Sequence, residues 1–594
     1  MRTLTVNGKD ISFFSIVLKT NPEPAEKRAA EFLARVIAAS CGVSLPVADR
    51  KTGPSILIGM LPENPEIKWD GFRICSDGDS VHLCGNLARG TLYAAYDFAE
   101  RFLGYRYLAV DTEIIPTEGS FEIPASFDLI QNPGFEGRRT DCQPPISYPE
   151  VASHYRLNDC MHLDETYGGL SPNSGECHTF GRLCPPEKYW DTHPEYYSLW
   201  EGKRVKVGND FSFDAQLCLS NPDVIRIATE NALDWMRKHP DLKILEISQC
   251  DNPRYCTCEN CARIDEEEGT HCGTIIRFVN AIAEAVEKEF PDVMVRTFAY
   301  IYSRQAPKIT RARKNVLIRY CTIEACFRHA LNDPSCKRNY GVFNTQLEEW
   351  GKMADQVSIW DYVCNYKCYI TPFPNLIALW KNARMFADNN VIQVFEESTG
   401  STFADGAYGD LKAYLIGRLL WNPYMTWEEY CAEIDTFLAG FYGPGWREIR
   451  DYIKMEHEVT ADKKMRCFAD VDVSETMHCD NKEIENFYYG EYIPKAYQPP
   501  LEDSFLSGLI ERLDEAFSYW DKAWALAEND TQKMHIERSR TSLTYLKLFC
   551  TRHDKKTMTA EEKAAYEAEV NRFYEDKEKY GFHYNIHTSA AHRR

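Results

Sequence analysis

Residues 241–262 read Asp-Leu-Lys-Ile-Leu-Glu-Ile-Ser-Gln-Cys-Asp-Asn-Pro-Arg-Tyr-Cys-Thr-Cys-Glu-Asn-Cys-Ala. The short, largely apolar run Leu242–Ile247 predicts a β-strand. The sequence Asp251-Asn252-Pro253 follows it and favours a turn, and an amphipathic helix is expected at 275–290. A strand, a polar loop and a helix form one βα unit, which delivers Asp251 to the carboxyl end of a strand. In a (β/α)8 barrel, the chemistry takes place in loops of that kind.

The overall composition indicates a large globular protein with several domains. A chain of 594 residues is too long for one compact domain, so about two to four are expected. Hydrophobic residues make up 44%, which is enough for a large core. The aromatic content of 13% suits both such cores and surfaces on which sugars stack.

Charge and hydropathy exclude several classes of partner. The net charge of −21 argues against nucleic acid and anionic membranes, because both would repel the protein. No stretch approaches the roughly 20 apolar residues that a membrane helix needs. The start of the chain has no apolar signal core, which predicts either a cytoplasmic protein or one from which a leader has been removed, and we expect the first. The oligomeric state is left open.

Three regions follow one another along the chain. Residues 1–125 predict a small α/β domain without an acid–base cluster, and therefore a supporting domain. Residues 126–445 alternate strand and helix, and residues 446–594 are mostly helical, with two patterned helices at 504–527 and 533–553. The strands of the middle region are expected at 134–139, 177–180, 215–220, 242–247, 293–300, 315–320, 356–360 and 391–395. Eight strand–helix repeats predict a (β/α)8 barrel.

Carboxylates end the late strands of this barrel. The candidate catalytic residues are Asp251, Glu324, Asp361, Glu396 and Glu397. Paired carboxylates at a barrel mouth are what glycoside hydrolysis requires, since one donates a proton and the other acts as base or nucleophile. Structural alternatives are a turn cap for Asp251 and a buried ion pair for Asp361.

Glu396 and Glu397 are adjacent, so only one of them can face the barrel axis in an extended strand. We expect Glu396 to be the general acid, because it follows the apolar Val394 and Phe395 and burial would keep it protonated. Asp361 or Asp251 would then be the ionised partner.

Polar and aromatic side chains near the same strand ends are candidate sugar contacts. A lone histidine such as His178 is more often structural than catalytic, but its position favours contact with a substrate hydroxyl. The candidate substrate-binding residues are His178, Asn252, Trp360, Tyr362, Tyr300 and Arg138.

The cysteines of the loop after Asp251 have the spacing of a metal site. Cys256, Cys258 and Cys261 could hold a structural zinc, with Cys250, His271 or Cys272 as the fourth ligand. Free thiols or one local disulfide are the alternatives. With 22 Cys and no leader, reduced thiols are favoured over a disulfide framework, and no catalytic cofactor is expected.

Several motifs in order resemble the domain-of-unknown-function family 4838, over roughly residues 175–445. They are 248–252 leading to 256–261, His193-Pro194-Glu195-Tyr196-Tyr197, 217–222, and 394–396 followed by 411–415. In addition, 90–98 with 102–104 resembles the amino-terminal domain of α-glucuronidases and β-hexosaminidases.

The resemblance implies a carbohydrate-active (β/α)8 enzyme. Some relatives are classed as glycoside hydrolase family 163, endo-β-N-acetylglucosaminidases that act on N-glycans, which makes that activity the first expectation. An α-glucuronidase-like hydrolase and a non-catalytic carbohydrate-binding barrel are the alternatives. Hexosaminidases that use the substrate's acetamido group typically carry adjacent Asp and Glu after strand four, whereas this chain has Asp251-Asn252. A direct mechanism with two carboxylates therefore stays open.

Overall fold

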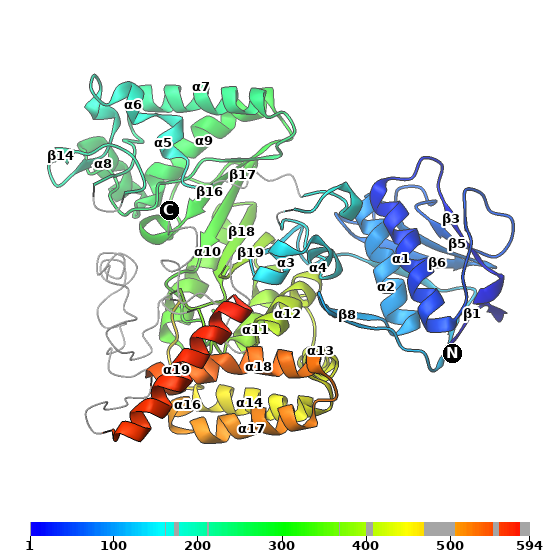
Figure 1. The fold of residues 1–594 in the computed structure, drawn as a ribbon. Helices are drawn as coiled ribbons and strands as arrows, with labels where there is room; N and C mark the ends of the chain where they lie inside the picture. Colours follow the sequence, from blue (N-terminus) through cyan, green and yellow to red (C-terminus); the bar gives the residue numbers. More distant parts are fainter. Residues whose placement is uncertain are drawn as a thin grey trace.

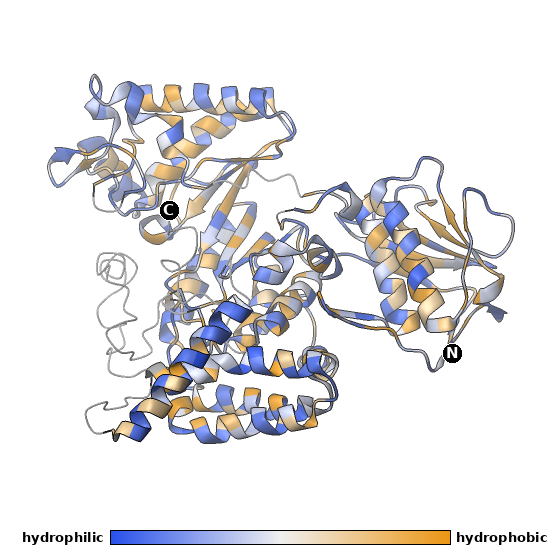
Figure 2. Ribbon diagram, in the orientation of Figure 1, coloured by the Kyte–Doolittle hydropathy of each residue, from blue (hydrophilic) through white to orange (hydrophobic). Residues whose placement is uncertain are grey.

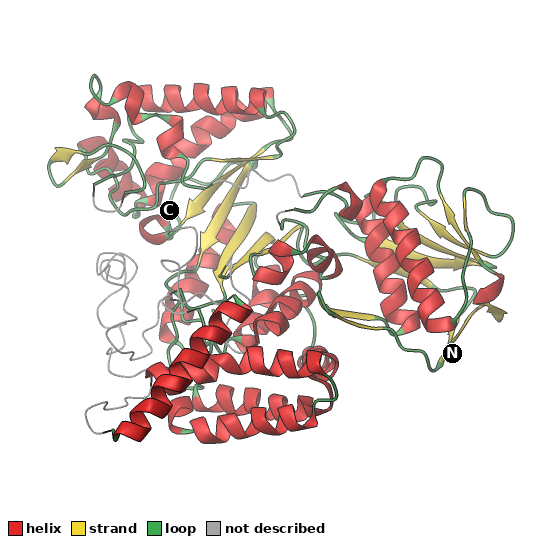
Figure 3. Cartoon of the chain, viewed as in Figure 1, coloured by secondary structure: helices red, strands yellow, loops and turns green. Residues whose placement is uncertain are grey.

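The computed structural model describes residues 2–160, 162–170, 177–210, 213–366, 369–399, 408–467, 505–550 and 558–581. Figure 1 shows three parts: an amino-terminal α/β domain on the right, a central parallel sheet, and a group of carboxyl-terminal helices at the bottom. In this view helices lie above and below the central sheet (Figure 3). Among the described residues, no helix combines the length and the apolar composition needed to cross a lipid bilayer.

The amino-terminal domain is a six-stranded sheet covered by two helices. Its strands, in sheet order, are β11 (Asp128–Gln131), β6 (Phe72–Asp77), β7 (Ser80–Gly85), β5 (Ser55–Ile58), β3 (Ser15–Leu18) and β4 (Val47–Ala48). Helices α1 (Pro24–Cys41) and α2 (Ala88–Leu103) pack on each other and on this sheet. Pro24 opens α1, and Gly42 ends it in the left-handed conformation, which is typical helix-end chemistry. Hydrophobic residues concentrate on the strands (Figure 2). The sheet of this region extends to β11.

The central sheet contains six strands, all parallel. They are, in sheet order, β12 (Gly137–Thr140), β19 (Val391–Glu397), β18 (Gln356–Tyr362), β17 (Val316–Cys321), β16 (Met294–Ala299) and β15 (Ile244–Glu246). The helices that connect them include α7 (Pro222–Lys238), α9 (Cys272–Glu289), α10 (Thr345–Met353), α11 (Leu376–Ala387) and α12 (Gly409–Trp421). Together they form a curled half-barrel.

Two of the eight expected strands, at 177–180 and 215–220, are not formed in the structure. Residues 177–179 are irregular and run into helix α5 (Phe180–Leu183), while Ala215 and Leu217 make only isolated bridges. The reason at the first segment is the backbone of His178, whose φ of 56° breaks an extended strand. The backbone N–H groups of Thr179 and Phe180 instead share the carbonyl of Ser248, at 3.0 and 3.1 Å. The prediction of a complete (β/α)8 barrel is therefore not confirmed.

The carboxyl-terminal region is helical, as expected. Its main helices are α13 (Trp427–Tyr442), α14 (Trp446–Val459), α16 (Ser507–Glu511), α17 (Leu513–Leu526), α18 (Asp530–Tyr545) and α19 (Ala560–Tyr580). Trp520 of α17 is fully buried and lies edge-on against Tyr442 and Tyr452. Residues 468–504 of this region lie outside the described residues.

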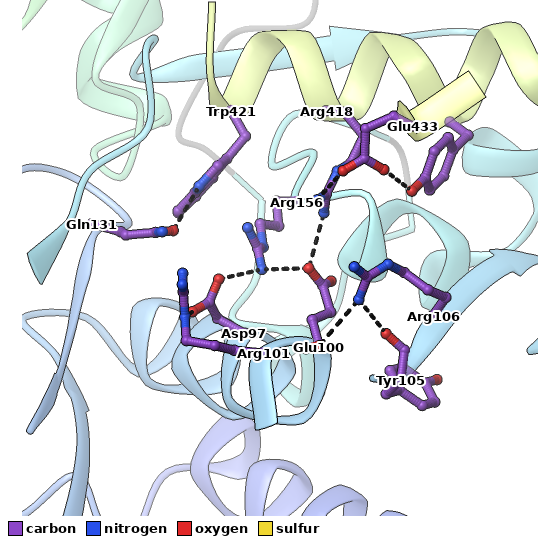
Figure 4. A network of polar contacts seen from close by, with 11 residues as sticks. Asp97, Glu100, Arg101, Tyr105, Arg106, Gln131, Arg156, Arg418, Trp421 and Glu433 are labelled. Atoms are coloured by element: carbon purple, nitrogen blue, oxygen red, sulfur yellow. Dashed lines mark hydrogen bonds and ion pairs between the residues drawn. The ribbon is translucent and has the colours of Figure 1, made fainter. Parts of the chain in front are cut away.

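Buried ion pairs join the amino-terminal domain to the helices behind the central sheet (Figure 4). Glu100 of α2 accepts hydrogen bonds from Arg418 of α12 at 3.0 Å and from Arg156 at 3.4 Å. Arg418 also pairs with Glu433 of α13 at 2.7 Å. Burial raises the pKa of Glu100, but the charges of Arg156 and Arg418 outweigh it and hold the pKa at about 2.

We expect Glu100→Gln to weaken this junction by about 2 kcal/mol near neutral pH, because Arg156 and Arg418 lose one charged acceptor and keep only Asp97 and Glu433. The folded-state pKa lies below the ordinary value of 4.5, so the stabilisation is complete above about pH 4.5 and is lost as the pH falls toward 2. Urea unfolding followed by tryptophan fluorescence at pH 7 and at pH 3 measures this. The difference between mutant and wild type should shrink at pH 3. Glu31→Gln, on the exposed side of α1, is the control and should leave the midpoint unchanged.

Candidate active site

A cavity of about 250 Å³ lies at the carboxyl ends of the central strands. It is lined by Cys177, His178, Asp251, Phe298, Tyr300, Cys321, Ile323, Trp360, Tyr362, Tyr366 and Glu397. Parallel sheets bind ligands at this edge, because the loops that follow the strands converge there.

A larger cavity of about 520 Å³ lies at the domain junction. Its charged groups Glu100, Arg156 and Arg418 satisfy one another, which identifies it as a structural junction.

Strand pairing decides which acidic residues face the cavity. In the register of β18 and β19, Trp360 pairs with Phe395, Asp361 with Glu396, and Tyr362 with Glu397. Side chains alternate between the two faces of a strand. Trp360, Tyr362 and Glu397 therefore share the inner face and line the cavity, whereas Asp361 and Glu396 point to the other face.

Glu397 is held in a protonated state at neutral pH. The indole Nε1 of Trp360 donates a hydrogen bond to its Oε2 at 2.6 Å. Burial raises the pKa of Glu397, and the nearby charge of Asp141 raises it further, to about 8, against the opposing effects of Trp360, Tyr366 and Arg139. A carboxylic acid with this pKa can donate a proton near neutrality.

Asp141 is a site residue that the sequence analysis missed. It follows Thr140, the last residue of β12, and β12 pairs with β19. Its carboxylate accepts a hydrogen bond from the backbone N–H of Ser398, immediately after Glu397. The rule that identified the other acids, a carboxylate directly after a predicted strand, would have found Asp141 had it been applied to the first strand.

Asp251 stands on a different wall of the cavity, after β15. The hydroxyl of Tyr300 donates to its Oδ1 at 3.1 Å, and its own backbone N–H donates to Asn209 at 2.9 Å. Burial raises the pKa of Asp251 above its ordinary value, although the positive charge of His178 and the hydrogen bond from Tyr300 act in the opposite direction. Asp251 and Tyr300 both line the cavity.

His178 enters the cavity from the segment that replaces an expected strand. Its Nδ1 lies 2.8 Å from the carbonyl oxygen of Gln249, and its backbone N–H donates to Ser248 Oγ at 2.9 Å. Burial lowers the pKa of His178, but hydrogen bonding to Cys177 and the charge of Asp251 outweigh it and raise the pKa to about 9. His178 is therefore a cation beside Asp251 at neutral pH.

The expectation that Glu396 faces the barrel axis is corrected by this geometry. Glu396 and Asp361 are both buried on the outer face of the sheet. Thr322 Oγ1 donates to Asp361, whose pKa is raised to about 6 by burial. Burial and the charge of Asp361 raise the pKa of Glu396 well above its ordinary range. The sequence could not fix which member of the Glu396-Glu397 pair turns inward.

Three other candidates also lie away from the cavity. Glu324 is fully buried in an ion pair with Arg304. The side-chain amide of Asn252 donates to the Gly208 carbonyl at 2.8 Å and accepts from the backbone of Arg254, so it orders its own loop. Arg138 is fully buried and binds Asp70 of the amino-terminal domain at 2.7 Å. None of these three side chains lines the cavity, and each has a structural partner instead.

The cysteine motif gathers with a fourth thiol from another segment. The sulfur atoms of Cys218, Cys256, Cys258 and Cys261 all lie within 4.8 Å of one another. Cys218 was not among the expected fourth ligands, which were Cys250, His271 and Cys272. Of those, His271 is engaged by Asp265 at 2.7 Å instead.

A family model for a domain of unknown function (DUF4838) matches residues 107–454, more than half of the chain, and the chain belongs to that family. Among solved structures, it is similar to a family GH115 4-O-methyl-α-glucuronidase with specificity for decorated arabinogalactans. That match has a TM-score of 0.55 and 12% identity, and covers 96% of this chain and 76% of that one.

A GH138 enzyme targeting pectin rhamnogalacturonan II is more distant, with a TM-score of 0.44 and 11% identity over 95% of this chain and 73% of that one. No curated protein matches the sequence. At such identities the likeness to the α-glucuronidase establishes a shared fold.

The raised pKa of Glu397 has a consequence for stability. Between about pH 4.5 and 8 the folded protein binds more protons at this site than the unfolded chain, so Glu397 destabilises the fold increasingly as the pH rises through that window. We expect Glu397→Gln to raise the melting temperature by about 2 °C or more at pH 8. The gain should vanish near pH 4.5. Thermal unfolding at both pH values measures it, with Glu31→Gln as the control; a gain that does not depend on pH would contradict the assignment.

Proposed function

We propose that this protein is a glycoside hydrolase in which Glu397 is the general acid. The observation that carries the proposal is a partly buried carboxyl group with a pKa of about 8, facing a cavity at the strand ends that it shares with a second carboxylate, Asp251. Glycoside hydrolysis needs such a pair, one member protonated and the other ionised. The fold shared with an α-glucuronidase adds support.

Glu397 would donate its proton to the leaving glycosidic oxygen. Trp360 holds the acid in place through its indole N–H, and Asp141 acts as a positioning residue whose charge keeps Glu397 protonated. Asp251, stabilised by Tyr300 and His178, would be the ionised partner. Asp251 follows strand β15, which lies four positions from β19 in the sheet. A separation of about 6.5–9.5 Å between the two carboxyl groups would leave room for a water molecule and imply inversion, whereas about 5–5.5 Å would imply retention.

Aromatic side chains give the cavity its affinity for a sugar ring. Phe298, Tyr300, Trp360 and Tyr362 line it, and the rings of Phe298 and Trp360 meet edge to face at 5.7 Å. Such faces stack on the apolar side of a pyranose, while Glu397 and Asp251 are available to its hydroxyl groups.

For the substrate, the family resemblance favours an endo-β-N-acetylglucosaminidase. Because Asn252 follows Asp251 and its side chain is engaged within its own loop, we propose the direct two-carboxylate mechanism. An α-glucuronidase-like activity is the second candidate. It is favoured by His178, a cation on the cavity wall that could pair with the carboxylate of a uronic acid.

The matched pair Glu397→Gln and Glu396→Gln tests the general acid, because the two residues are adjacent and point to opposite faces. We expect Glu397→Gln to lower turnover of natural glycans by about 10²–10⁴-fold. Aryl glycosides with good leaving groups need little protonation and should lose much less. Glu396→Gln should retain most of the wild-type turnover on both.

The substrate panel should include N-glycans, N-acetylglucosaminides and glycosides of uronic acids, with the anomer released followed by NMR. Turnover lost in Glu396→Gln and retained in Glu397→Gln would place the acid on the other face of the strand. If wild-type protein binds sugars of the panel but cleaves none, the chain is a carbohydrate-binding module instead.

A further inference from the structure

We propose that Cys218, Cys256, Cys258 and Cys261 bind one zinc ion in a closed, structural tetrathiolate site. Two chain segments supply these ligands, one before α7 and the other after β15, the strand that follows α7. This inference is independent of the proposed hydrolase activity, since it concerns what stabilises the loops before α7 and after β15.

The spacing of the sulfur atoms fits tetrahedral zinc. Cys218 Sγ lies 3.6 Å from Cys258 Sγ and 4.0 Å from Cys261 Sγ. With Zn–S bonds of about 2.3 Å, the sulfurs of a tetrahedral site are about 3.8 Å apart. A disulfide is excluded for these pairs, because its sulfurs would lie at about 2.05 Å, and all four thiols are free. The ion would therefore fit without rearrangement of the chain.

Donor groups surround the cluster as thiolate ligands require. The backbone N–H of Leu199 donates to Cys256 Sγ at 3.3 Å, and Arg204 Nη1 approaches the same sulfur at 3.8 Å. The hydroxyl of Ser220 contacts Cys261 Sγ at 3.0 Å. Hydrogen bonds of this kind stabilise metal-bound thiolates, and the arginine offsets part of the negative charge of four thiolates around one zinc.

The thiols form a small apolar cluster apart from the main core. Cys218, Cys256 and Cys261 belong to it, with Leu199 packed against it. The regular structure near it includes the two-residue strands β13 (Leu199–Trp200) and β14 (Lys203–Arg204) and helix α8 (Glu259–Glu268). So small a core is commonly supported by a metal or a disulfide.

The site would position the loop that carries Asp251. The side-chain amide of Gln216 donates to the carbonyls of Cys250 and Asn252, at 2.9 and 2.7 Å. The bound zinc would join the same two segments a second time, through Cys218 in the first and Cys256 in the second. Asp251 would thus be held between the hydrogen bonds of Gln216 and the zinc site, which begins five residues later at Cys256.

A second group of possible metal ligands, Cys326, His329 and Cys336, affects how many zinc ions the chain is expected to bind. Its ligand atoms also lie within 4.8 Å of one another. It offers three ligands among the described residues, and His329 Nε2 lies 3.1 Å from the carbonyl oxygen of Ala461. A three-ligand set is not a closed structural site. We therefore expect one zinc per chain, not two.

Metal analysis of the full-length protein, purified without a polyhistidine tag from zinc-supplemented cells, should find about one zinc per chain. Cys218→Ser should remove most of it. Cys250→Ser and Cys336→Ser are the matched controls and should keep it. Cobalt substituted for zinc in the wild type should show strong thiolate-to-metal charge-transfer absorption, which Cys218→Ser should abolish.

Alkylation of wild-type protein gives a test that does not require a variant to fold. Mass spectrometry should show Cys218, Cys256, Cys258 and Cys261 protected from iodoacetamide, and all four labelled after treatment with a zinc chelator. Absence of zinc together with labelling that the chelator does not change would overturn the proposal. Zinc retained by Cys218→Ser but lost from Cys336→Ser would move the metal to the other cluster. Because no readout uses sugar turnover, the result stands apart from the hydrolase assignment.

Discussion

The parallel pairing of β18 with β19 is the constraint on which the candidate site depends. It sets Trp360, Tyr362 and Glu397 on one face and Asp361 and Glu396 on the other. A slip of one residue in either strand would exchange the two sets. The hydrogen bond from Trp360 to Glu397 bridges the two strands on the inner face, so the pairing that builds the sheet also orients the proposed acid.

Two carboxyl groups on one cavity experience opposite electrostatic surroundings. Burial raises the pKa of both, but Glu397 is also near the negative charge of Asp141, which favours its protonated form, whereas Asp251 is near the positive charge of His178, which favours its ionised form. This asymmetry is what acid–base chemistry on a sugar requires. Keeping an acid protonated by burial and by a like charge also weakens the fold, so the site is maintained at the expense of stability.

The half-barrel is completed by loops where two strands were expected. The segments at 177–180 and 215–220 attach to the end of β15 through the carbonyl of Ser248 and the side chain of Gln216. Because they are not strands, they are free to deliver His178 to the cavity and Cys218 to the cysteine cluster. The irregular edge of the sheet thus carries a large part of the site.

The sequence by itself determined the late strands and the acids that follow them, because apolar runs and turn residues act locally. It also determined the helical end of the chain and the cysteine motif around Cys256. Tertiary structure decided which of Glu396 and Glu397 faces inward, since strand parity depends on pairing with a distant strand. It also brought Asp141 to Glu397 and Cys218 to the other thiols, and their separations along the chain are too long for local patterns to reveal. The physical reason in each case is the same: a side chain's environment is set by the partners that the fold brings to it.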